Sequence, residues 1–256
     1  MLPRSSCLEI KSNLDVQSSE MKIDKEKLDR EGFLLVKNVL KPEEVQALRE
    51  AAYATIEADK EKGTMFLHRF AKNHLGCLSN ISAFKKLILD DRVVNIAEQA
   101  LGGRPLFFGD SVFEIGIGSR GFHKDTSERK DENHPDWTDP NYPIYRIAFY
   151  LEDHKNHSGG LKARIGSNRT VKTNSGKAVI IPSEPGDAVI FNLKTSHAGN
   201  AVRVKGMPNK SWHNRIEKRI PKFLRVPEEK ERVSIFLTYG RESGCLLYTS
   251  PSPRDA

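Results

Sequence analysis

The chain has 256 residues, of which 38% are hydrophobic and 29% charged, and this composition is that of a globular protein with a hydrophobic core rather than of a disordered chain. No apolar stretch approaches the roughly 20 residues that a membrane span needs, so we expect a soluble protein without a membrane partner. The net charge of +7 comes from acidic and basic residues mixed along the chain, whereas nucleic-acid-binding proteins concentrate basic residues in one stripe, so we expect no nucleic-acid partner.

We expect one domain at residues 21–243, preceded by a flexible arm at 1–20. The tail at 244–256 continues no pattern of the chain and resembles translated sequencing-adaptor sequence, so we expect it to be non-native. The three cysteines are Cys7, Cys77 and Cys245. Their odd number and the lack of CxxC spacing indicate neither a disulfide framework nor a zinc site, which favours a reducing, cytoplasmic setting.

The first third of the chain has helical patterns. Asp24 is a typical helix N-cap, Gly32 ends that short helix, and the apolar run at 33–36 follows as a buried strand. A longer helix is predicted from Pro42 to Gly63, because apolar residues recur there at helical spacing. Two more helices are predicted, at 84–89 and 93–101.

From Leu106 onward the sequence changes to short β-rich runs separated by turn residues. These runs are 106–108, 112–115, 145–151, 179–181, 188–191 and 233–239. Such spacing predicts an antiparallel sandwich or barrel, and the fold class is therefore α+β with a mainly β core and the N-terminal helices packed on one face of the sheet. Two long inserts, at 127–141 and 205–231, interrupt the strands, and inserts of this kind are often lids.

The triplet His123-Lys124-Asp125 is the first candidate for chemistry. In an extended segment the i, i+2 spacing points His123 and Asp125 to the same side. A His-x-Asp triplet alone is weak evidence for a metal site, because His134-Pro135-Asp136 has the same form. His134, however, precedes a proline in a polar insert, where a solvated loop is the simpler interpretation.

His197 strengthens the interpretation of the first triplet as part of a metal site. It lies just beyond the apolar strand at 188–191, and enough chain separates it from Asp125 for intervening strands to bring the two together. Two imidazole nitrogens and one carboxylate suit iron(II) and leave three coordination positions for other ligands. We therefore expect His123, Asp125 and His197 to be both the metal ligands and the catalytic centre.

Arg232-Val233-Ser234 begins the last convincing strand and is a candidate anion clamp. Arg232 and Ser234 share one face of the strand, and a planar guanidinium matches a carboxylate bidentately. Tyr145, on a predicted inner strand, is a further candidate for binding a cosubstrate, although core packing accounts for it equally well.

Together these segments resemble the phytanoyl-CoA dioxygenase family of iron(II)/2-oxoglutarate oxygenases over roughly residues 30–240. The segments that carry the resemblance are 32–36, 41–49, His123–Asp125, 158–167, 185–191, His197 and Arg232–Ser234. The resemblance implies a double-stranded β-helix, that is, a cupin-like jelly roll. It also implies that His123, Asp125 and His197 bind Fe(II), that Arg232 holds the distal carboxylate of 2-oxoglutarate, and that O₂ is the oxidant.

The implied activity is hydroxylation of a small organic substrate, with oxidative decarboxylation of 2-oxoglutarate to succinate and CO₂. The stretch between His197 and Arg232 is longer than is usual in the family, so Arg203 is a rival for the clamp. Basic residues around the motifs favour an anionic substrate weakly, and the protein is expected to be a monomer or a homodimer. Two alternatives stay open, a non-oxidative cupin-type protein that binds a metal or a sugar, and a non-catalytic binding protein.

Overall fold

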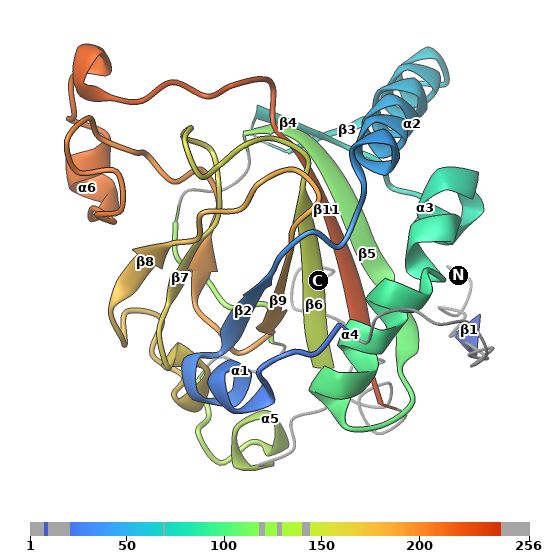
Figure 1. Cartoon of the computed structure of the whole chain (residues 1–256), viewed down its shortest axis with the longest axis horizontal. Helices are drawn as coiled ribbons and strands as arrows, with labels where there is room; N and C mark the ends of the chain where they lie inside the picture. The colour runs from blue at the N-terminus through green and yellow to red at the C-terminus, as the bar shows by residue number, and fades with distance from the viewer. Residues whose placement is uncertain are drawn as a thin grey trace.

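Two antiparallel sheets, one large and one small, form the framework of the computed structural model (Figure 1). The structure describes residues 8–9, 21–68, 70–117, 121–126, 130–139 and 144–241. The expected tail at 244–256 and all of the expected arm except Leu8 and Glu9 lie outside these residues. No helix in the described part of the chain combines the length and the apolar character that crossing a membrane requires.

The large sheet has eight strands, with β2, β9, β6, β11, β5, β4 and β3 side by side in this order and β1 paired with β5. Their bounds are β1 Leu8–Glu9, β2 Phe33–Val36, β3 Phe66–His68, β4 Phe70–Asn73, β5 Leu106–Ile117, β6 Ile144–Tyr150, β9 Ala188–Asn192 and β11 Val233–Gly240. The small sheet has the order β10-β7-β8. Its strands are β7 Lys162–Arg164, β8 Ala178–Ile180 and β10 His197–Ala198.

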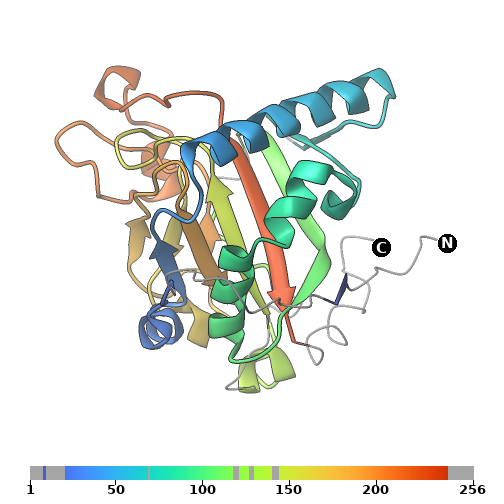
Figure 2. The same ribbon diagram turned by 45° about the vertical axis from the view of Figure 1, so that its right-hand side comes forward.

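The N-terminal helices cover one face of the large sheet, and the small sheet lies on the opposite side (Figures 1 and 2). These helices are α1 Lys25–Glu31, α2 Pro42–Glu61, α3 Ser82–Ile88 and α4 Asp91–Leu101. Short helices lie in the connections, namely η1 Leu78–Asn80, α5 Pro135–Thr138, η2 Ser167–Arg169, α6 Asn214–Glu217 and η3 Lys222–Leu224.

Local sequence explains where the helices begin and end. The Asp24 carboxylate accepts a hydrogen bond from the backbone N–H of Lys27 at 2.9 Å, which caps α1, and Gly32 ends this helix with a φ of 88°. In α2, Pro42 occupies the first turn, where the missing N–H costs nothing, and the Glu44 carboxylate accepts from the backbone N–H of Lys41 at 2.7 Å.

Side chains of the central strands alternate between two environments. On β6, Ile147 and Phe149 belong to the cluster that includes the helices, whereas Ala148 and Tyr150 pack with residues of the small sheet such as Ala163. This alternation follows from the two-residue period of a strand. Every second side chain of β6 therefore points into the space between the two sheets, and the candidate functional side chains lie in that space.

The predicted fold class is confirmed, with a jelly-roll core and helices on one face. The predicted helices and most strands match the structure within a few residues. Five short strands, β1, β3, β4, β7 and β10, were not predicted, because runs of two to four residues are too short to show a clear two-residue alternation. The runs at 106–108 and 112–115 belong to one strand, β5, whose pairing with β11 is irregular between Phe236 and Thr238.

Candidate metal centre

Backbone pairing brings the His123 triplet beside β10. His123 and His197 form an antiparallel bridge in which each backbone N–H donates to the other residue's carbonyl, at 3.0 and 2.9 Å. The backbone N–H of Asp125 donates to the carbonyl of Leu193 at 3.0 Å. His123 is thereby held by β10, and Asp125 is held by the turn between β9 and β10. The backbone that positions His197 therefore also positions Asp125.

The three side chains converge as expected from the sequence. One ligating atom from each of His123, Asp125 and His197 lies within 4.8 Å of the others. His123 Nε2 is 3.6 Å from Asp125 Oδ1, and His197 Nε2 is 3.4 Å from Asp125 Oδ2. Among the described residues, this is the only cluster of three His, Cys, Asp or Glu side chains with such proximity.

The hydrogen bonds of the two rings fix their tautomers. His123 Nδ1 lies 3.0 Å from the carbonyl of Gly121, and His197 Nδ1 lies 3.0 Å from the carbonyl of Thr195. A carbonyl only accepts, so each Nδ1 must carry the proton. In the neutral ring, Nε2 then presents a bare lone pair toward Asp125, and this is the arrangement in which a backbone carbonyl orients a metal-ligating histidine.

Burial keeps His197 neutral. It is 5% exposed, and the loss of hydration lowers the pKa of its imidazole to about 4, despite the opposing effect of the Asp125 charge. The lone pair of the neutral His197 ring faces the Asp125 carboxylate, and a divalent cation relieves their repulsion. The donor set of two imidazoles and one carboxylate fits Fe(II), with positions left for other ligands.

Arg146 on β6 contacts the carboxylate of Asp125, one of the three candidate ligands. Its Nη1 donates to Asp125 Oδ2 at 2.7 Å, its Nη2 donates to Asp110 Oδ2 at 2.8 Å, and its Nε donates to Thr238 Oγ1 at 3.1 Å. Burial raises the pKa of Asp110, although the Arg146 charge acts in the opposite direction. Arg146 therefore orients Asp125 and balances its charge.

The predicted clamp lies on the same inner face. Arg232 is 3% exposed, and its guanidinium donates through Nε to the carbonyl of Gly116 at 3.0 Å and through Nη2 to Glu114 Oε2 at 3.1 Å. Its Nη1 makes no hydrogen bond to any residue that the structure describes. Ser234 is paired in register with both Glu114 on β5 and Tyr150 on β6, so all these side chains border one space.

Two buried hydroxyls beside Arg232 lack partners. Ser234 Oγ and the Tyr150 hydroxyl have no hydrogen-bond partner among the described residues. Burial raises the pKa of Tyr150, so this hydroxyl stays protonated and can donate. Buried polar atoms normally find partners, and a guanidinium flanked by two such hydroxyls fits a carboxylate of a bound small molecule.

Two other sequence candidates do not join this space. Arg203 is 1% exposed and donates through Nε to the carbonyl of His154 and through Nη1 to that of Pro208, each at 3.0 Å, so it fastens loops together. The expectation that Tyr145 binds the cosubstrate is corrected. It packs in the helix-side cluster and its hydroxyl donates to Asp29, because neighbouring residues on a strand point to opposite faces.

The second His-x-Asp triplet has a structural function. His134 is the N-cap of α5, where its Nδ1 accepts from the backbone N–H of Asp136 at 3.2 Å. Asp136 is 2% exposed and accepts from Thr126 Oγ1 at 2.6 Å. The second triplet is thus a helix cap joined to Thr126, next to the first triplet, rather than the solvated loop that the sequence indicated.

Comparison with known proteins agrees with this geometry. The family model for phytanoyl-CoA dioxygenase (PhyH) matches residues 28–207, which is more than half of the chain. The chain belongs to the phytanoyl-CoA dioxygenase family. It is accordingly an iron(II)/2-oxoglutarate-dependent dioxygenase. The matched segment contains His123, Asp125 and His197 but ends before Arg232, and no curated protein matches the chain.

Solved structures share the fold at low identity. They include the non-heme alpha ketoglutarate dependent carbocyclase SnoK from nogalamycin biosynthesis, at 16% identity and a TM-score of 0.59, with 92% of each chain covered. EctD from S. alaskensis with 2-oxoglutarate and 5-hydroxyectoine has 15% identity and a TM-score of 0.59, covering 94% of this chain and 84% of EctD. HygX from Streptomyces hygroscopicus with nickel, 2-oxoglutarate and hygromycin B has 16% identity and a TM-score of 0.57, covering 86% and 88%.

Proposed function

We propose that His123, Asp125 and His197 hold Fe(II), that Arg232 and Ser234 bind the distal carboxylate of 2-oxoglutarate, and that the protein hydroxylates a C–H bond of a small organic molecule. One O₂ is consumed, one oxygen atom enters the substrate, and the other enters the succinate formed as 2-oxoglutarate loses CO₂. The convergence of the Nε2 atoms of His123 and His197 on the Asp125 carboxylate carries this proposal.

A metal held by these three residues would supply the redox chemistry that activates O₂. The protein's residues supply position and charge. Arg146 holds Asp125 in place through its Oδ2, while the carbonyls of Gly121 and Thr195 hold the two imidazoles. Arg232 offers its Nη1 to the anionic end of the cosubstrate, and the unpaired hydroxyls of Ser234 and Tyr150 complete that contact.

The decisive experiment is an anaerobic titration of the protein with Fe(II) and 2-oxoglutarate. Chelation is expected to produce a weak visible charge-transfer band, and admission of air is expected to release succinate and CO₂. His197→Ala removes the band, because a donor from β10 is lost. His134→Ala is the matched control, since it alters a histidine of the same His-x-Asp form that caps α5, and it retains the band.

The outcomes separate the two classes of protein that the sequence left open. Metal binding without a band or succinate would favour a non-oxidative cupin-type protein. Metal affinity unchanged by His197→Ala would contradict the assignment of ligands altogether.

Two broader features of the function are also part of the proposal. A cytoplasmic location is supported by the odd number of cysteines and their lack of paired spacing. A small-molecule substrate is supported by the enclosed position of the metal centre between the two sheets, where His197 is 5% exposed. Fractionation of cells that express the chain tests the location, and sedimentation distinguishes a monomer from a homodimer.

A further inference from the structure

A groove of about 790 Å³ lies between the small sheet and the insert that follows β10. Its lining consists of Phe122, Arg164, residues 177–180 and residues 209–213. Lys210 bridges to Val179, so the insert continues the edge of the small sheet at β8. The groove is of the size that takes a single small molecule, since pockets of about 300–1,000 Å³ hold drug-sized ligands.

The groove is separate from the metal centre. His197 lies directly opposite Ala163 in the antiparallel pair, and Ala163 packs into the cluster between the sheets. Opposed residues share a face and neighbouring residues alternate, so Arg164 points to the outer face. Phe122 precedes His123, and the centre of its ring lies 4.4 Å from the Arg164 guanidinium carbon. The groove therefore uses the outer face of the sheet whose inner face carries His197.

The insert is held firmly against the sheet. Lys162 on β7 is fully buried, and its Nζ donates to both carboxylate oxygens of Glu217 on α6, at 2.7 and 2.8 Å. Arg225 also donates to the carbonyl of Glu217 at 3.1 Å. These contacts fix one wall of the groove before any ligand binds, which lowers the entropic cost of binding.

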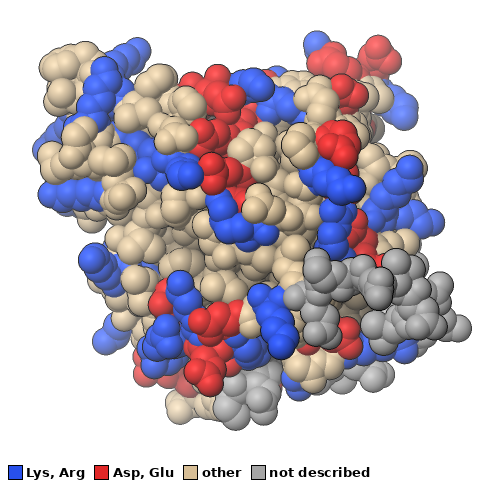
Figure 3. Space-filling model, in the orientation of Figure 1, with Lys and Arg blue, Asp and Glu red and all other residues tan. Residues whose placement is uncertain are grey.

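The charged side chains that line the groove are all basic. Arg164, Lys177 and Lys210 line it, together with His213, and no Asp or Glu does. Aromatic rings hold two of the cations in place: the Arg164 guanidinium lies over Phe122, and Lys210 Nζ lies 4.0 Å from the centre of the Trp212 ring. In Figure 3, Lys and Arg gather at the upper left, over the insert that carries α6.

Three polar atoms of the lining residues are buried without a partner. Arg164 Nε, Ser211 Oγ and Trp212 Nε1 make no hydrogen bond to the described residues. Each of them can donate, and buried donors without acceptors are uncommon in proteins. These atoms are buried beneath the lining, whereas the cations of the lining are the groups that call for a ligand with negative charge.

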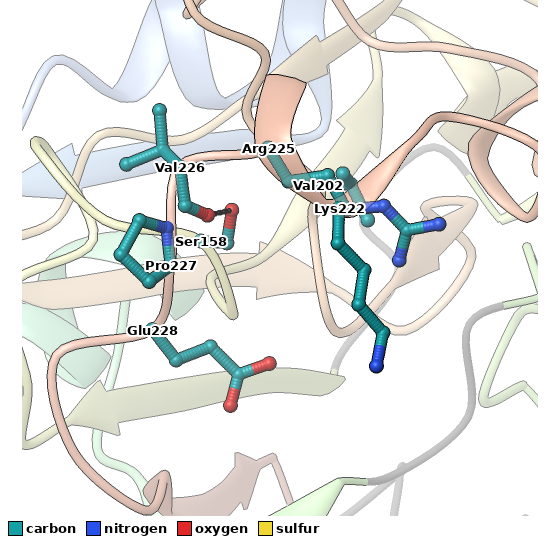
Figure 4. Close-up of a pocket in the computed structure, with 7 residues that line it drawn as sticks. All are labelled: Ser158, Val202, Lys222, Arg225, Val226, Pro227 and Glu228. Carbon is teal, nitrogen blue, oxygen red and sulfur yellow. Dashed lines mark hydrogen bonds between the residues drawn. The ribbon is translucent and has the colours of Figure 1, made fainter.

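The hollow shown in Figure 4 provides a contrast. It has a volume of about 460 Å³, and the Glu228 carboxylate lines it together with Lys222 and Arg225. Its Ser158 hydroxyl is already satisfied, because it donates to the carbonyl of Val226 at 2.5 Å. This hollow has mixed charge as well as a satisfied hydroxyl, so it lacks the uniformly basic lining that points to an anion.

We propose that the groove between β7, β8 and residues 209–213 is a second binding site, which takes a small organic molecule carrying a phosphate group. The three cations Arg164, Lys177 and Lys210 match a divalent phosphate better than a single carboxylate. Phe122, Ala178 and Ile180 provide apolar surface for the rest of the molecule.

Isothermal titration of the intact protein with phenyl phosphate tests the proposal. We expect saturable binding with a Kd below about 1 mM, and weaker binding of benzoate, which has the ring but only a single negative charge. Lys177→Ala and Lys210→Ala each weaken binding about fivefold, because each removes one exposed cation from the groove. These lysines are exposed, so the variants are expected to fold normally.

Two further variants separate this groove from other sources of affinity. Lys218→Ala removes the same charge from an exposed position of the same insert outside the groove, and it leaves the Kd unchanged. Arg232→Gln alters the inner clamp and also leaves the Kd unchanged, so the result is independent of whether 2-oxoglutarate binds there. The proposal is overturned by the absence of saturation, by equal affinity for benzoate, by an equal effect of Lys218→Ala, or by loss of binding in Arg232→Gln.

Discussion

Replacement of Arg232 by Ala is expected to weaken 2-oxoglutarate binding strongly. The structure leaves Nη1 of this residue available beside two unpaired hydroxyls, whereas Nε and Nη2 are bound to Gly116 and Glu114. A hydrogen bond to a charged group contributes about 1.5–3 kcal/mol, so its loss raises the Kd of 2-oxoglutarate about 10- to 150-fold. Arg232→Lys keeps the charge but loses the planar guanidinium. Its Kd for 2-oxoglutarate is expected to lie between those of the wild type and Arg232→Ala.

Arg203→Ala is the matched control for this variant. Arg203 donates to the carbonyls of His154 and Pro208, and its removal leaves these acceptors unsatisfied in a buried place. We expect a loss of about 2–4 kcal/mol in the free energy of unfolding, with an unchanged Kd in the folded protein. Anaerobic calorimetric titration with 2-oxoglutarate in the presence of Fe(II) measures the Kd, and urea unfolding measures the stability. A Kd within twofold of wild type in Arg232→Ala, or a lost site in folded Arg203→Ala, would refute this assignment.

Three further changes test the framework around the site. Arg146→Gln is expected to weaken Fe(II) affinity about 10- to 100-fold, measured by competition with a chelator, because Asp125 loses the partner that orients it. The hydrogen bond from Arg92 lowers the pKa of Glu44, so on acidification this carboxylate is protonated at a higher pH in the unfolded chain than in the folded protein. The pair therefore stabilises the fold fully above about pH 4.5, and this stabilisation is lost as the pH falls further. Glu44→Gln should therefore cost about 1 kcal/mol at pH 7 in urea unfolding, allowing for solvent screening of this partly exposed pair, and less at pH 3. Lys162→Met is expected to cost about 3–5 kcal/mol because Glu217 stays buried and unpaired, and adding Glu217→Leu should restore much of that loss in thermal unfolding.

Features that depend only on residues close together in the sequence could be predicted from local patterns. The caps at Asp24 and Gly32 and the i, i+2 spacing of the metal triplet are of this kind. Residues whose function depends on distant strands were harder to assign. Tyr145 was chosen on a predicted inner strand, but its neighbour Arg146 faces the site, and only the register of β6 decides which of the two points inward.

The long stretch between His197 and Arg232 shows why distance along the chain is a poor guide to the proposed clamp. Arg203 is closer to His197 in sequence, yet β10 belongs to the small sheet and β11 to the large one. The position of Arg232 is set by the pairing of Val233 with Ile115 and of Ser234 with Tyr150, which does not depend on how much chain precedes β11. Because Lys162 and Glu217 fasten the insert to the outer face, extra residues there extend the small sheet without displacing the clamp. Substitutions within 209–213 are therefore expected to change the outer groove while leaving the 2-oxoglutarate affinity unaltered.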